Sequence, residues 1–107
     1  MDIKCAIIEL KPNSRHAVKE WSKTLNERKD EVLETLKQEG IKVESAFLTA
    51  IEDKDYLIYY VRAENIHHAI QTTQTSSLNI DIYHKKFKKN TWNKHIETQL
   101  LLDVTTD

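Results

Sequence analysis

The side chain best suited to chemistry in this sequence is a histidine on an apolar helical stripe. His84 shares its helical spacing with three neighbours, Ile80, Tyr83 and Phe87. Its ring is therefore expected to face the protein interior. An imidazole there can act as a general acid or base, or hold a polar ligand through its nitrogens. We take His84 as the predicted catalytic residue, with a packed, hydrogen-bonded core histidine as the alternative.

Four further residues could complete a ligand pocket around His84. Arg28 falls on the apolar face of a long helical pattern, two turns from Trp21, where a guanidinium could clamp a carboxylate. A side chain that reaches out to solvent is the alternative. Tyr59 and Tyr60 alternate along a strand, so one of them faces the helices. Because small-molecule sites are mostly apolar with a few polar groups, we predict Trp21, Arg28, Tyr59 and Tyr60 as ligand-binding residues.

Motifs for metals, nucleotide cofactors and nucleic acids are missing from the sequence. The five histidines form no His-x-x-x-His pair, and Cys5 is the only cysteine, so we expect no metal site. One glycine cannot build a phosphate loop, so no cofactor is expected. The net charge is −1, and the basic run 85–89 is interpreted as a solvated helix face, with phosphate contact as the alternative. We therefore expect no nucleic-acid partner.

Length and hydropathy indicate a single cytoplasmic domain. The chain has 107 residues, the size of one domain, which we place at residues 1–107. No window approaches 18 uninterrupted apolar residues, and the N-terminus lacks the apolar core of a signal peptide. We therefore expect neither a membrane partner nor export. A lone cysteine, Cys5, fits a reducing compartment.

The order of hydrophobic patterns predicts the fold. Runs rich in β-branched residues indicate strands, and apolar residues spaced three to four apart indicate helices. The expected elements are a strand at 3–10, a helix at 14–39, strands at 43–52 and 56–63 joined by a turn at 53–55, a short helix from Asn65, a loop at 72–77, a helix at 80–92 and a strand at 96–104. Gly40 follows the long helix, where a left-handed residue is wanted. This β-α-β-β-α-β order predicts an α+β, ferredoxin-like fold, a four-stranded antiparallel sheet with its helices on one face.

The strands carry apolar residues on both faces, which predicts an assembly. Phe47 and Ile51 alternate with Leu48, for example, whereas helices on one side cover only one face of a sheet. The other face would expose an apolar patch that monomers seldom carry. We therefore expect a homodimer packed through its sheet faces, a dimeric α/β barrel. Charged residues in the strand runs are expected at strand ends or at the barrel rim; they are Lys4, Glu9, Glu44, Glu97 and Asp103.

Several short segments, in their order and spacing, resemble a small bacterial family of unknown function. They are Lys11-Pro12, Lys19-Glu20-Trp21, Leu25-Asn26-Glu27, Glu39-Gly40, Val43-Glu44, Phe47, Tyr56-Leu57-Ile58-Tyr59-Tyr60, Ile80-Asp81, His84 and Phe87. The likeness spans about residues 3–103. It implies the dimeric α/β-barrel fold, and it adds Asp81 to the predicted ligand-binding residues.

The superfamily that this resemblance implies includes cofactor-independent monooxygenases, sugar mutarotases, muconolactone isomerases and haem-handling enzymes, which hold their ligand between sheet and helices. The chain lacks the paired tryptophans of the mutarotases and has Leu25 where their helix-one histidine aligns. We therefore expect a small-molecule-binding protein, with cofactor-independent catalysis of the monooxygenase or isomerase kind as one form of that function. The alternative is a non-catalytic regulatory or interaction module whose sheet face serves homodimerisation.

Overall fold

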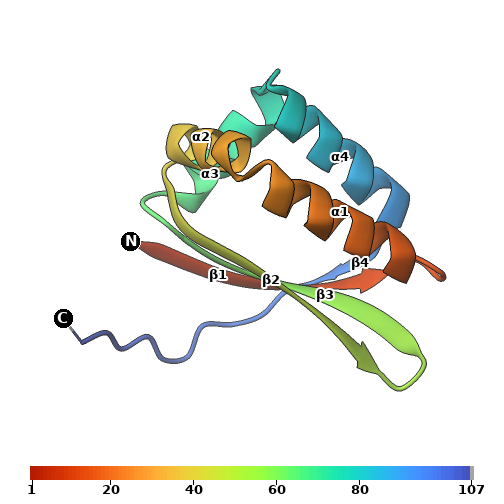
Figure 1. Cartoon of the computed structure of the whole chain (residues 1–107). Coiled ribbons are helices and arrows are strands. Elements are labelled where there is room, and N and C mark those ends of the chain that lie inside the picture. The colour runs from red at the N-terminus through yellow and green to blue at the C-terminus, as the bar shows by residue number, and fades with distance from the viewer. Residues whose placement is uncertain (107) are drawn as a thin grey trace.

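The computed structural model describes residues 1–106, which form one antiparallel sheet with helices on a single face (Figure 1). Its elements are β1 (Asp2–Leu10), α1 (Arg15–Glu27), α2 (Lys29–Glu39), β2 (Ile41–Ile51), β3 (Lys54–Ala63), α3 (Ile66–Thr75), α4 (Asn79–Thr91) and β4 (Trp92–Ile96). The strand order is β2-β3-β1-β4. This arrangement confirms the predicted ferredoxin-like α+β fold, with two consecutive helices in each crossover.

Strand alternation divides the sheet into an inner face under the helices and an outer face. Ala6 lies opposite Tyr59, and Ile8 lies opposite Leu57, so β1 and β3 present one common apolar surface to the helices. The buried core on this face comprises Ala6, Ile8, Leu10, Val18, Trp21, Leu57, Tyr59 and Phe87. Each large aliphatic side chain contributes about 1.5–3 kcal/mol when fully buried, so the inner face is the main source of packing energy.

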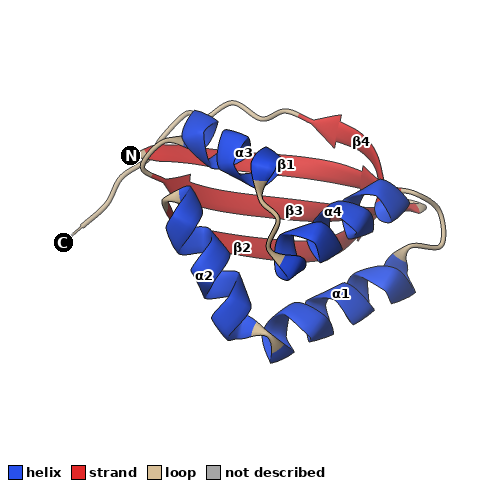
Figure 2. Cartoon of the chain, turned by 90° about the horizontal axis from the view of Figure 1, so that it is seen from above, coloured by secondary structure: helices blue, strands red, loops and turns tan. Residues whose placement is uncertain are grey.

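The single helix expected at residues 14–39 is two helices, and the prediction was wrong in this respect. Arg28 separates α1 from α2 with φ −112° and ψ 38°. Its N–H still donates to the Thr24 carbonyl at 3.0 Å, and its own carbonyl accepts the N–H of Val32 at 3.1 Å. An unbroken helix would be about 39 Å long, whereas the whole fold measures 38 Å along its longest axis. The break sets α2 at an angle to α1, so that its end meets the start of β2 (Figure 2).

Two backbone positions with positive φ shape the connections around β2. Gly40 ends α2 with φ 73°, which confirms the predicted left-handed glycine. Ile51 pairs directly with Lys54, so the hairpin loop is the two residues Glu52 and Asp53 and not the expected 53–55. Glu52 has φ 56°, because a two-residue hairpin loop needs a left-handed residue to match the twist of its strands.

Helix α3 continues into the segment that was expected to form a loop at 72–77. The Thr73 hydroxyl lies 3.0 Å from the Ala69 carbonyl, a contact that threonine commonly makes inside a helix. The helix begins where predicted, since Asn65 Oδ1 accepts the N–H of His68 at 3.0 Å. Only residues 76–78 separate α3 from α4.

The last strand lies earlier in the chain than expected. β4 pairs Ile96 with Ile7 of β1, and the strand predicted at 96–104 is wrong because residues 97–106 form no strand. Its three central leucines, Leu100, Leu101 and Leu102, are exposed. The tail runs on the side of the sheet opposite the helices (Figure 1), where Asp103 forms an ion pair with Arg62 at 2.9 Å.

Candidate functional site

His84 lies in an aromatic cluster between the helices and the sheet. α1 supplies Trp21, β3 supplies Tyr59, and α4 supplies His84 and Phe87. The Trp21 and Phe87 rings stack with their centroids 4.5 Å apart, and the Trp21 indole N–H donates to His84 Nδ1 at 3.1 Å. The structure therefore brings together three of the predicted site residues, Trp21, Tyr59 and His84.

This environment holds His84 in its neutral form. Burial, assisted by the Lys88 ammonium, lowers the pKa of His84 to about 4, and the Asp81 charge opposes the shift. Nδ1 accepts the Trp21 proton, so the neutral ring carries its own proton on Nε2. At neutral pH the imidazole is a hydrogen-bond donor through Nε2 and carries no charge.

Two buried polar atoms beside this cluster have no hydrogen-bond partner within residues 1–106, namely Tyr59 Oη and Trp92 Nε1. Burial raises the pKa of Tyr59, and the Glu44 charge adds to the rise, so the phenol keeps its proton. The Trp92 indole lies close to the phenol and offsets part of the rise in the Tyr59 pKa, but the two groups are not placed to form a hydrogen bond.

A second polar cluster ties three helices together. Thr35 and Glu39 come from α2, Thr73 from α3 and Asp81 from α4, with Ser76 in the loop before α4. Thr35 Oγ1 lies 2.7 and 2.6 Å from the two Asp81 oxygens and 3.0 Å from Glu39 Oε1. The Thr73 hydroxyl bonds to the other Glu39 oxygen, and the Ser76 hydroxyl bonds to Asp81. Asp81, a predicted ligand-binding residue, is thus engaged by side chains of the protein itself.

The hydrogen bonds of this second cluster need a proton on a carboxyl group. Thr35 has one hydroxyl proton, yet its oxygen lies within bonding distance of both Glu39 and Asp81. If both carboxyls were ionised, one of these contacts would set lone pair against lone pair. Burial raises the pKa of Glu39 against opposing hydrogen bonds from Thr73 and Thr35, and the Asp81 charge raises it further. Of the two carboxyls, Glu39 is therefore the one whose surroundings favour the protonated form.

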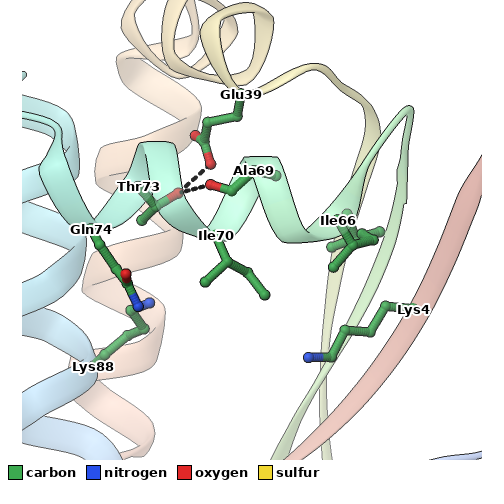
Figure 3. Close-up of a pocket in the computed structure, with 9 residues that line it drawn as sticks. Lys4, Glu39, Ile66, Ala69, Ile70, Thr73, Gln74 and Lys88 are labelled. Atoms are coloured by element: carbon green, nitrogen blue, oxygen red, sulfur yellow. Dashed lines mark hydrogen bonds between the residues drawn. The ribbon is translucent and has the colours of Figure 1, made fainter.

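A cavity of about 240 Å³ lies between α3, α4 and the inner face of the sheet (Figure 3). Its lining residues are Lys4, Glu39, Val61, Ile66, Ala69, Ile70, Thr73, Gln74 and Lys88. In Figure 3 the Lys4 side chain extends from one side and the Lys88 side chain from the other, with Ile70 of α3 between them. The cavity thus combines an apolar wall with two ammonium groups, and we call it the interlayer pocket.

The two lysines of the interlayer pocket form no ion pair with any residue in the range 1–106. The Lys88 ammonium lies 5.1 Å from the centre of the Trp92 ring, a cation–π contact. Burial lowers the pKa of Lys88, and the charges of Glu44 and Glu39 oppose that shift. Ammonium groups that lie beside apolar side chains without a direct ion pair favour an anion, because burial strengthens the attraction between opposite charges.

Comparison with known protein families identifies the family of this chain. The family of unknown function DUF6176 matches residues 1–107. The chain belongs to DUF6176. None of the curated proteins and none of the solved structures compared with the chain matches it. Because the family match covers the whole chain, the aromatic cluster and the interlayer pocket both belong to the DUF6176 domain.

Two predicted site residues of this DUF6176 chain lie away from both clusters. Tyr60 faces outward, and its hydroxyl accepts a hydrogen bond from Arg62 Nε at 2.9 Å. Arg28 lies at the break between α1 and α2, where it forms two hydrogen bonds of 2.6 Å with the Glu31 carboxylate. Neither residue is brought next to His84, so of the two alternating tyrosines only Tyr59 faces the helices.

Three candidates were missed by sequence reasoning: Lys4, Glu39 and Lys88. Lys88 belongs to the basic run that was interpreted as a solvated helix face, yet it follows His84 by four residues and so shares its helical stripe. Lys4 was expected at a strand end or rim, but it alternates with Ala6 and faces inward. These spacings were readable in the sequence. No local pattern marks Glu39, because its partners Thr73 and Asp81 are distant in the chain.

Among residues 1–106, no three His, Cys, Asp or Glu side chains converge in a way that could hold a metal ion. In the same range, no helix has the length and apolarity needed to span a bilayer.

Proposed function

We propose that this protein binds a small organic anion, a carboxylate, in the interlayer pocket. The observation that carries the proposal is the pair of lysines, Lys4 and Lys88, which face a partly apolar cavity and have no ion-pair partner among residues 1–106. Taking an ammonium group out of water is costly unless an opposite charge compensates for it. A carboxylate ligand supplies that charge.

The size of the pocket limits the ligand to a short molecule. Its volume of about 240 Å³ lies below the ~300–1,000 Å³ typical of pockets for drug-sized ligands. Ile66 and Ile70 offer contacts to a hydrocarbon segment, and Gln74 offers an amide to a second polar group. A carboxylic acid with a short aliphatic body matches these walls best.

The role expected for His84 is a separate part of this proposal. His84 lies one helical turn before Lys88 on α4, so a ligand that extends past the Lys88 ammonium would approach its Nε2–H. In the cofactor-independent enzyme that we expect from the sequence, this neutral ring would donate a hydrogen bond through Nε2. The tight aromatic packing around His84 favours the alternative, a non-catalytic regulatory or interaction module in which this ring is only packed.

A titration followed by amide NMR tests the binding site. Sodium acetate, compared with sodium chloride at equal ionic strength, should shift the amide signals of pocket residues such as Ala69 and Thr73. Lys88→Met should weaken acetate binding about tenfold or more, because a charge-assisted hydrogen bond contributes about 1.5–3 kcal/mol. Lys86→Met is the matched control, since Lys86 is exposed on the same helix. Equal affinity in the two variants, or shifts confined to the outer sheet face, would contradict the proposal.

We also propose that the protein is a homodimer of the dimeric α/β-barrel superfamily. Support comes from the outer sheet face, where β2 exposes three large apolar side chains, Val43, Phe47 and Ile51. The tail, which contains the exposed leucines, runs along the same side of the sheet (Figure 1). Two outer-face charges are already neutralised, since Arg62 pairs with Asp103 and Glu9 pairs with Lys54. A second copy could therefore cover this apolar surface without placing like charges in contact.

A further inference from the structure

The interlayer pocket shares a wall with the cluster that holds a proton. Glu39 and Thr73 belong to both, because they line the cavity and are hydrogen-bonded to each other. Figure 3 shows the Glu39 carboxyl meeting the Thr73 hydroxyl at the edge of the pocket, on the α3 side. A change of charge inside the cavity therefore acts directly on the protonation of Glu39.

We infer that the interlayer pocket takes up its carboxylate together with a proton, which is held on Glu39. This inference rests on the proposed function and names the chemical condition under which that site binds. Thr35 bridges Glu39 and Asp81 with one hydroxyl proton, so the pair is satisfied only when one carboxyl is protonated. An anion held between the pocket lysines adds negative charge next to this pair. Ionised Glu39 then becomes less favourable, and ligand binding retains or recruits the proton.

The charged groups around the Glu39 carboxyl come from three other elements. They are Asp81 and Lys88 on α4, Glu44 on β2 and Lys4 on β1, whereas α3 turns only uncharged side chains to the cavity. Glu44 is a further acid whose proton the ligand would affect. Burial raises the pKa of Glu44 to about 7, with a further rise from Glu39. Its side chain is nevertheless open to solvent at the sheet edge, so we expect a smaller rise than that.

Calorimetric titration of the full chain with sodium acetate, in buffers of different ionisation enthalpy, measures this proton directly. Acetate is ionised at neutral pH, so any proton taken up on binding enters the protein. Wild type should take up part of a proton per acetate and lose up to about tenfold in affinity per pH unit as Glu39 ionises. Glu39→Gln should bind acetate with much less proton uptake and a flatter pH profile. Glu44→Gln is the matched control, and its proton uptake per acetate should retain the contribution of Glu39.

A ligand-free measurement covers the case in which Glu39→Gln binds poorly. Infrared spectra of the free protein over a pH series should show the carbonyl stretch of a protonated carboxyl, and this band should persist to higher pH in wild type and in Glu44→Gln than in Glu39→Gln. The same pH profile of this band in wild type and Glu39→Gln, or equal proton uptake in the two proteins, overturns the inference. Acetate binding by wild type without proton uptake overturns it as well, but leaves the proposed function standing. A wild-type protein that binds no acetate overturns both.

Discussion

The indole N–H of Trp21 donates a hydrogen bond to Nδ1 of His84 across the interface between α1 and α4. The bond fixes one neutral tautomer of the imidazole, and the stacked Phe87 ring holds its plane. The most reactive side chain of the sequence is thereby built into the packing of the two helices. Its chemistry is restricted to that of a neutral ring with the proton on Nε2.

We predict that the His84 ring does not titrate between about pH 8 and pH 5. The unfolded chain binds this proton near the ordinary histidine pKa of 6.5, whereas burial lowers the native pKa to about 4. Protonation therefore favours the unfolded state as the pH falls from 6.5 to 4, at a cost on the order of 2–3 kcal/mol by the end of that window. NMR titration of the His84 ring carbons measures the pKa. A midpoint near 6.5 would show that the ring is solvated.

Removing the Tyr59 hydroxyl should leave the free energy of unfolding within about 0.5 kcal/mol of wild type, or raise it. Tyr59 Oη is buried without a hydrogen-bond partner among residues 1–106, so Tyr59→Phe removes an unsatisfied group. Tyr60→Phe is the matched control and should cost about 1 kcal/mol, because the Tyr60 hydroxyl accepts a bond from Arg62. Urea unfolding of both variants measures the difference. A larger loss for Tyr59→Phe would mean that its hydroxyl has a partner.

The two carboxyls bridged by Thr35 should respond differently to neutralisation. Asp81→Asn should cost about 1–3 kcal/mol, because Asp81 accepts bonds from both Thr35 and Ser76. Glu39→Gln should cost less at neutral pH. The raised native pKa of Glu39 makes wild type lose stability as the pH rises from the unfolded value of 4.5 through the native one. Glutamine does not ionise and so abolishes that loss. The free energy of unfolding of Glu39→Gln relative to wild type should therefore increase with rising pH in denaturant titrations. The reverse order of the two variants would assign the proton to Asp81.

The proposed dimer predicts a mass of twice the 12.6 kDa chain in light scattering. Phe47→Asp should yield monomers, because Phe47 is 59% exposed on the outer sheet face and would lie in the contact. Leu33→Asp is the matched control, since Leu33 is 52% exposed on α2, on the helical side. Wild type that scatters as a monomer at micromolar concentration would rule out the sheet-face dimer.

The sheet could be predicted from the sequence because each strand has its own pattern of apolar residues. The break at Arg28 could not, since no proline or glycine lies near it and apolar spacing continues from Leu25 to Val32. A straight helix of this length would extend beyond the small sheet, and the break keeps its second half packed over the sheet. The strand predicted around Leu101 failed for another reason. An apolar run indicates that a segment tends to be buried. It does not show whether pairing in a sheet is what buries it.

The candidate site was only partly visible in the sequence. Trp21, Tyr59 and His84 meet because helical and strand periodicity place them all on inner faces. Lys4 and Lys88 were not predicted to line the pocket because lysine usually lies on the surface. The spacing of Lys88 from His84 places both residues on one stripe of α4, and there the structure follows periodicity, whereas at Arg28 the break between α1 and α2 interrupts it.

A crystal structure of the protein in acetate tests the central claim most directly. We predict a bound carboxylate between the ammonium groups of Lys4 and Lys88, within hydrogen-bond distance of at least one of them, with the methyl group against α3. The contradicting result is a pocket that holds only water at an acetate concentration that saturates the NMR shifts, with both lysines turned to solvent.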